Sequence, residues 1–309
     1  MMLGILWRRV FVALVMAALL ALAFFPWATD APLTAANQAE LQKYYTTAYQ
    51  QQNAATQSEA DSKYVRIAEE AAARLNIKGT VEEFARRYSL ADKKVLDIGA
   101  GRGYLQDVVE NYTGLDISPS ARRFFHKKFV HASATYMPFP DGEFDAAWTI
   151  WVLEHVPNPE AALSEMRRVL KHHGLLLLGP AWDCTPWAAQ GYPVRPYSDF
   201  SLAGKLIKAS IPIHSTLSFL SKVPIRLLRY GAWAAMRQPT KFHYRRLTPN
   251  YDQYWMPDSD AVNSLDHYEA ALWFISRGDD CLNCETAMHG WMDDNFPLII
   301  RINKQAPAQ

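Results

Sequence analysis

The chain has 309 residues, enough for one large domain or for a domain with a substantial insertion. Half of the residues are hydrophobic, which excludes wholesale disorder. The formal net charge of +1 argues against a general nucleic-acid-binding protein, which usually has a marked basic excess. Three cysteines cannot form a disulfide framework, so the composition is that of a globular protein from a reducing compartment.

The first thirty residues differ from the rest because Val10–Thr29 is an uncharged run of twenty residues. About twenty helical residues are needed to cross a hydrocarbon core of about 30 Å. Arg8 and Arg9 precede the run, and a tryptophan lies near each end, as membrane-interface residues do. We predict a membrane anchor in residues 1–30. A cleaved signal peptide is the alternative, although no clear cleavage site follows.

Residues 31–92 are predicted to form a helical arm or linker. Thr34–Asp61 is rich in Gln, Ala, Asn and Thr, with three tyrosines as its expected anchors: Tyr44, Tyr45 and Tyr49. Apolar residues at helical spacing predict two helices, Tyr64–Leu75 and Val81–Tyr88.

From Lys93 onward, short apolar runs alternate with helical stretches, which is typical of βαβ units and a parallel sheet. Strands are predicted at Lys94–Ile98, Tyr112–Ile117, Phe129–Ala132, Phe144–Ile150 and Leu175–Gly179. Helices are predicted at Tyr104–Asn111, Pro119–His126 and Pro159–His172. Two more apolar runs could close the sheet, Ala270–Ser276 and Pro297–Ile302. We therefore expect an α/β domain over residues 93–309, a doubly wound, mainly parallel seven-stranded sheet with residues 181–266 inserted after the fifth strand.

A glycine-rich turn follows the first predicted strand. Gly99, Gly101 and Gly103 let the backbone turn tightly and approach a ligand closely. Asp116 ends the next strand, where a carboxylate can accept two hydrogen bonds from a ribose diol. The pattern predicts a site for a nucleoside.

The spacing of this turn separates two kinds of nucleotide site. The glycines stand as G-x-G-x-G rather than G-x-G-x-x-G, and Asp97 lies two residues before the first glycine. A carboxylate there would repel a pyrophosphate and attract an ammonium or a sulfonium. An oxidoreductase with a nicotinamide cofactor is therefore disfavoured.

The segment Val95–Leu105, VLDIGAGRGYL, resembles motif I of class I S-adenosylmethionine-dependent methyltransferases, in particular the type 11 group that includes quinone-biosynthetic enzymes. The resemblance covers about Lys93 to Pro180 and continues through Gly114–Ser118, Met137–Asp145, Val152–Val156 and Glu160–Leu170. It implies a Rossmann-like methyltransferase fold, S-adenosylmethionine as cofactor and methyl transfer as the reaction.

The resemblance also implies which residues contact the cofactor. The glycine turn would hold the methionine part with Asp97 near its ammonium, and Asp116 would hold the ribose with Ile117 against the adenine. The family usually has an Asp-Ala pair where this chain has Ser133 and Ala134, so we expect weaker adenine recognition. The implied cofactor-binding residues are Asp97, Gly99, Ala100, Gly101, Gly103, Asp116, Ile117, Ser133 and Ala134.

His155 follows the fourth predicted strand, at the sheet edge where the cofactor is expected. An imidazole can act as a general base near neutral pH, so His155 is the predicted catalytic residue. A structural histidine that caps a turn is the alternative, because in-line positioning alone can supply much of the rate.

Two features outside the motifs leave alternatives open. Cys281 and Cys284 have the spacing of a metal or redox pair, but no second pair completes a zinc site. We predict plain loop cysteines and no metal site, and a structural metal or a redox disulfide is the alternative. Residues 201–250 contain nine basic and no acidic residues, whereas residues 251–300 contain ten acidic residues and one arginine. The basic segment suits an anionic membrane surface, and the alternative is that the two segments pair with each other.

We therefore predict a methyltransferase for a small-molecule or lipid-like acceptor at a membrane surface, without a nucleic-acid partner. By the positive-inside rule, Arg8 and Arg9 would place the domain outside the cytoplasm, whereas S-adenosylmethionine is cytosolic. Two arginines are a weak signal, so we predict a domain on the cytoplasmic face. The alternative is a non-catalytic or exported binding protein that keeps the fold, which Ser133 and the arginines favour.

Overall fold

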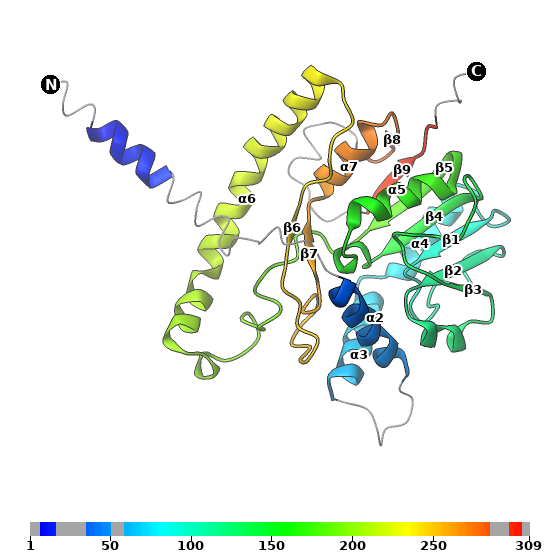
Figure 1. The fold of residues 1–309 in the computed structure, drawn as a ribbon, viewed down its shortest axis with the longest axis horizontal. Helices are drawn as coiled ribbons and strands as arrows, with labels where there is room; N and C mark the ends of the chain where they lie inside the picture. The colour runs from blue at the N-terminus through cyan, green and yellow to red at the C-terminus, as the bar shows by residue number, and fades with distance from the viewer. Residues whose placement is uncertain (1–6, 17–34, 51–58, 285–296, 305–309) are drawn as a thin grey trace.

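The computed structural model describes residues 7–16, 35–50, 59–284 and 297–304. Their centre is a seven-stranded sheet in the order β3-β2-β1-β4-β5-β9-β8 (Figure 1). The strands are β1 (Val95–Ile98), β2 (Tyr112–Asp116), β3 (Lys128–His131), β4 (Phe144–Ile150), β5 (Leu170–Gly179), β8 (Asp280–Cys281) and β9 (Leu298–Arg301). Strands β1 to β5 pair in parallel, and β9 is antiparallel to both of its neighbours. The predicted mainly parallel, seven-stranded α/β sheet is confirmed.

Helices cover both faces of this sheet, which explains why its central strands are almost continuously apolar. Leu96 and Ile98 of β1 pack in the core beneath α5 (Pro159–Val169) and α7 (His267–Ile275). Val95 faces the opposite core, which includes α4 (Ile77–Arg87). The arm contributes two further helices, α2 (Ala35–Gln50) and α3 (Glu59–Arg74).

The start of α5 follows its predicted capping pattern, but its end does not. The Asn158 side chain accepts a hydrogen bond from the Ala161 backbone N–H, and Pro159 occupies the first turn. The helix stops at Val169 rather than His172, because the next residues already belong to β5: Leu170 pairs with Phe144 ahead of a register shift.

Three of the predicted helices and strands are wrong or differ in kind. Residues 104–111 form turns rather than a helix, since only twelve residues connect Gly103 to Asp116 and successive i to i−3 bonds close this short link. Residues 119–124 form a 3₁₀ helix, η1. The run Ala270–Ser276 is not a strand but most of α7, which Asp266 caps by accepting from the Tyr268 backbone N–H.

The insertion contains the 35-residue helix α6 (Leu202–Met236) and a separate hairpin of β6 (Tyr244–Arg246) and β7 (Asn263–Leu265). Arg226 and Arg229 of α6 form ion pairs with Asp266 and Glu269 at 2.9 and 2.8 Å. For these two arginines the prediction of membrane contact is wrong, and the alternative, pairing between the basic and acidic segments, is correct.

Cys281 and Cys284 form a disulfide, so their interpretation as plain loop cysteines is wrong. The turn that follows β8 brings their Cα atoms to 5.4 Å, within the range that a disulfide spans.

The N-terminal prediction falls largely outside the described residues. Residues 7–16 are helical and exposed, and they lie beyond α6 at the far end of the molecule (Figure 1). Residues 1–6 and 17–30, the rest of the predicted anchor, are not described. Within the described ranges, no helix combines the length and hydropathy that a membrane crossing requires.

Candidate active site

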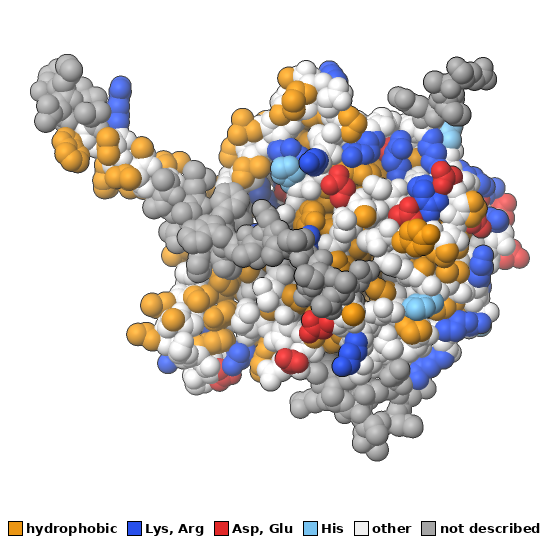
Figure 2. Space-filling model, viewed as in Figure 1, with side chains coloured by type: hydrophobic (Ala, Val, Ile, Leu, Met, Phe, Trp, Pro, Cys, Tyr) orange, Lys and Arg blue, Asp and Glu red, His pale blue; other side chains and the backbone are white. Residues whose placement is uncertain are grey.

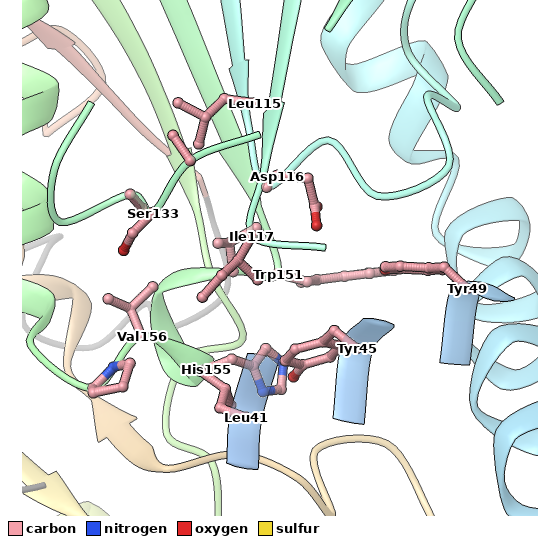
Figure 3. Close-up of a pocket in the computed structure, with 15 residues that line it drawn as sticks. Leu41, Tyr45, Tyr49, Leu115, Asp116, Ile117, Ser133, Trp151, His155 and Val156 are labelled. Carbon is pink, nitrogen blue, oxygen red and sulfur yellow. The ribbon is translucent and has the colours of Figure 1, made fainter. Parts of the chain in front are cut away.

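A pocket of about 640 Å³, including space open to solvent, lies at the carboxyl ends of β1, β2 and β4 (Figure 3). Ligands of open α/β sheets bind at this edge, where the strand order reverses. Helix α2 covers the pocket with Leu41, Tyr45 and Tyr49. The sheet therefore provides the floor and the N-terminal arm provides the cover.

The glycine turn shapes the β1 side of the pocket. Gly99 has φ +75°, and a Cβ on it would lie 2.2 Å from the Val152 side chain, so only glycine fits. The backbone N–H groups of Gly99 and Ala100 both donate to the Leu115 carbonyl, which fastens the turn to β2. Of the predicted turn residues, Gly99 lines the pocket, whereas Ala100, Gly101 and Gly103 do not.

Gly101 and Gly103 have other neighbours. A Cβ on Gly101 would lie 3.1 Å from the Tyr49 hydroxyl, so this residue faces the α2 cover. A Cβ on Gly103 would lie 2.8 Å from Gln106 and 3.1 Å from Phe125, which leaves no room for a ligand on that side. Gly103 therefore serves the turn and its packing against Gln106 and Phe125.

Asp116 presents its carboxylate to the pocket from the tip of β2 (Figure 3). Its two oxygens accept hydrogen bonds from the backbone N–H groups of Gly101 and Ser118, each at 2.8 Å. Burial raises the pKa of Asp116, and these two hydrogen bonds act against that rise. Since each carboxylate oxygen can accept more than one hydrogen bond, both remain able to accept from a ribose diol.

Asp97 lies beneath the turn rather than in the pocket wall. It is buried, and its carboxylate accepts a hydrogen bond of 2.7 Å from the Tyr112 hydroxyl. Burial raises the pKa of Asp97 to about 7, partly offset by that hydrogen bond. The expected contact with an ammonium stays a prediction.

Ile117, Ser133 and Ala134 line the part of the pocket where the adenine is expected. The Ser133 hydroxyl lies 2.8 Å from the Thr135 hydroxyl and accepts a hydrogen bond from the Thr135 backbone N–H. Ser133 thus holds its own turn, and the expected weak recognition of adenine stays a prediction.

His155 lies across the pocket from Asp116, in the 3₁₀ turn η2 (Leu153–His155) after β4 (Figure 3). Its Nδ1 is 3.6 Å from an Asp260 carboxylate oxygen, and its Nε2 is 3.7 Å from a Glu154 carboxylate oxygen. Asp258 completes the group, with ligand-type atoms of Glu154, His155 and Asp258 all within 4.8 Å of one another. The Tyr45 hydroxyl donates to Asp260 at 2.7 Å.

The carboxylates govern the charge of this imidazole. Burial alone would lower the pKa of His155, but Asp260, Glu154 and Asp258 raise it above its ordinary value. Burial also raises the pKa of Glu154 to about 7, because its side chain is fully buried. The arrangement suits a histidine that gains and loses a proton.

Several residues of the site carry no signal in the sequence. Asp258 and Asp260, which surround His155 without lining the pocket, are about a hundred residues from it and reach it only through the fold of the insertion. Trp151, with φ +55°, lines the pocket directly after β4. The tyrosines of the arm were singled out as anchors, yet Tyr45 and Tyr49 also line this site.

Comparisons with known proteins agree with this geometry. A methyltransferase domain family matches residues 96–178. The chain is 27% identical to a fatty-acid O-methyltransferase of Mycolicibacterium smegmatis, over 56% of this chain and 69% of that enzyme. It is 42% identical to a ubiquinone/menaquinone biosynthesis C-methyltransferase of Ectopseudomonas mendocina, over 26% of this chain and 32% of that enzyme. It is 25% identical to a phthiotriol/phenolphthiotriol dimycocerosates methyltransferase of Mycobacterium ulcerans, over 51% of this chain and 65% of that enzyme.

The matches thus span between a third and about two thirds of these relatives. The family match covers most of β1 through β5, with the glycine turn. The buried Asp116 carboxylate at the tip of β2 and the tight turn at Gly99 fit a nucleoside with an amino-acid tail, as S-adenosylmethionine has. The chain therefore carries a methyltransferase domain of the S-adenosylmethionine-dependent methyltransferases, with S-adenosylmethionine as its cofactor.

Proposed function

We propose that the protein methylates a hydroxyl group of a lipid-like acceptor. The single observation that carries this proposal is His155, held in the pocket wall among three carboxylates and opposite the Asp116 carboxylate. S-adenosylmethionine, when bound, supplies an electrophilic methyl group on a sulfonium that leaves as a neutral thioether.

The two sides of the pocket have different tasks in this proposal. Gly99, Asp116 and Ile117 hold the cofactor on the β1–β2 side. Trp151 and His155 then remain for the acceptor, under the Tyr45 ring of α2. Positioning the acceptor oxygen in line with the methyl group removes much of the entropic part of the barrier.

His155 acts as the general base. Its Nδ1 lies 3.4 Å from the Asp260 carbonyl oxygen, so a proton on Nδ1 leaves the Nε2 lone pair to take the proton from the acceptor hydroxyl. The nearby carboxylates of Glu154 and Asp260 stabilise the imidazolium that forms. Loss of the proton would make the acceptor oxygen nucleophilic toward the methyl group that the cofactor supplies, with the thioether as the leaving group.

The same carboxylates select the type of acceptor. Two of the similar enzymes are named for a fatty acid and for phthiotriol dimycocerosates, which points to a lipid-like substrate. Glu154, Asp258 and Asp260 surround His155 and favour its protonated form, so the site suits an acceptor that gives up a proton, such as a hydroxyl, whereas a fatty-acid carboxylate has no proton to give. Apolar residues beside His155, including Val156 and Pro157, suit the hydrocarbon part of such an acceptor.

The membrane anchor in residues 1–30, with the domain on the cytoplasmic face, remains part of this proposal. Its support is the apolar run Val10–Thr29 and the cytosolic supply of the cofactor.

A matched pair of acceptors tests the proposed function. The purified protein is incubated with methyl-labelled S-adenosylmethionine and either a long-chain alcohol or the fatty acid of the same length. We expect labelled methyl ether from the alcohol and little methyl ester. His155→Ala should lower kcat by roughly a hundredfold or more, and Tyr136→Ala, on the surface, should not change it. Preferential ester formation, or a His155→Ala variant with unchanged kcat, would contradict the proposal.

A further inference from the structure

Helix α6 turns an apolar stripe toward solvent. Leu206, Ile213, Leu220 and Leu227 recur every seven residues and are exposed, the first three by more than 60%. At 1.5 Å per residue, the 35 residues of α6 extend over about 50 Å. Figure 2 shows hydrophobic side chains gathered over both ends of this helix. Surface helices of globular proteins normally place such a stripe against the core.

The polar side of α6 faces the protein instead. Lys222 and Arg229 form ion pairs with Asp183 and Glu269, and the buried Arg226 pairs with Asp266. Lys208 donates to backbone carbonyls of the segment before α6. The internal ion pairs therefore fix the rotation of the helix, and this rotation forces its aliphatic face outward.

The charges around the stripe indicate what covers it. The sequence of α6 contains no acidic residue, and exposed cations lie near its two ends, Lys205 and Arg237. The helix at residues 7–16 repeats this combination, with exposed Phe11 and Leu14 beside Arg8 and Arg9. Aliphatic side chains flanked by cations match the acyl layer and anionic headgroups of a bilayer.

We propose that the outward face of α6 inserts into the headgroup and acyl boundary of a membrane and so brings the pocket to a bilayer-embedded acceptor. The contact is mainly apolar, because most cations of α6 are paired internally. This inference rests on the proposed lipid-like acceptor, but it can fail separately.

An environment-sensitive fluorophore tests the insertion in the full-length chain. The label is attached through Ile213→Cys, on the stripe, and in a control through Tyr136→Cys, whose side chain is 79% exposed and belongs to the loop between β3 and β4 rather than to α6. The natural cysteines do not compete, since Cys184 is buried and the other two form a disulfide. Vesicles contain phosphatidylcholine and phosphatidylglycerol, with a spin-labelled acyl chain as quencher.

We expect blue-shifted, quenched emission from the label at position 213 and no change at position 136. Full-length protein that binds vesicles without a change at position 213 would overturn the proposal, because another segment would then make the contact. A blue shift without vesicles, growing with protein concentration, would also overturn it and assign the stripe to a second copy of the chain.

An activity comparison separates this inference from the proposed function. Leu220→Glu should methylate a water-soluble short-chain alcohol at the same rate as wild type. Its rate toward a long-chain alcohol in vesicles should be roughly tenfold lower than that of wild type. Equal activity of the variant and wild type on both acceptors would refute membrane docking. If the wild-type protein transfers methyl groups to neither of the two alcohols, the proposed function is refuted instead.

Discussion

Replacement of Asp116 by alanine removes the contact on which cofactor recognition depends. Two charge-assisted hydrogen bonds from a ribose diol contribute about 1.5–3 kcal/mol each, so affinity for S-adenosylmethionine should fall by at least about a hundredfold. The substitution also leaves the backbone N–H groups of Gly101 and Ser118 without their acceptor. Because the pocket admits water to these groups, we expect a loss of only about 1–3 kcal/mol in the free energy of unfolding.

Isothermal titration calorimetry measures the affinity, and urea unfolding measures the stability of the same samples. Asp116→Asn serves as the matched variant, since it keeps the size of the side chain and one acceptor oxygen, and should bind with intermediate affinity. The affinity of Ser133→Ala for S-adenosylmethionine should fall by less than about tenfold, since the Ser133 hydroxyl already contacts Thr135. A dissociation constant of Asp116→Ala within threefold of wild type would refute the role of this carboxylate.

Three further predictions concern the turn, the base and the insertion. Gly99→Ala should lower the free energy of unfolding by about 2–5 kcal/mol in urea titrations, because its Cβ would clash with Val152 at a positive φ. The rate of hydroxyl methylation should rise with pH, because His155 must be unprotonated to act. Its raised pKa sets the midpoint of the pH–rate profile above 6.5, and a midpoint below that value would contradict the assignment. Arg226→Ala should cost about 3–5 kcal/mol in the same unfolding assay by leaving the Asp266 carboxylate without its main partner, and a loss below 1 kcal/mol would argue against the internal ion pairs.

The sheet and the cofactor side of the pocket were predictable because their signals are local. A buried parallel strand needs a short apolar run, and the turn after β1 needs glycine at Gly99, whatever the rest of the chain does. The predicted strands therefore lie close to β1 through β4, and Asp116 reaches the pocket from the expected strand tip.

The acceptor side was not predictable for the opposite reason. Asp258 and Asp260 carry no motif of their own and meet His155 only after the insertion folds back over β4. The run that became α7 was ambiguous in sequence, since a buried helix and a buried strand are both uniformly apolar. Likewise, the basic composition of the insertion did not reveal that Arg226 and Arg229 point inward, because ion pairing across forty residues depends on the rotation of α6.

A structure of the protein with bound S-adenosylhomocysteine tests the account most directly. We predict the ribose hydroxyls on the Asp116 carboxylate, the adenine beside Ile117 and Ser133, and the sulfur directed toward the space in front of His155. A nucleoside bound elsewhere, or one whose sulfur points away from His155, would contradict the assignment of this pocket as the site of methyl transfer.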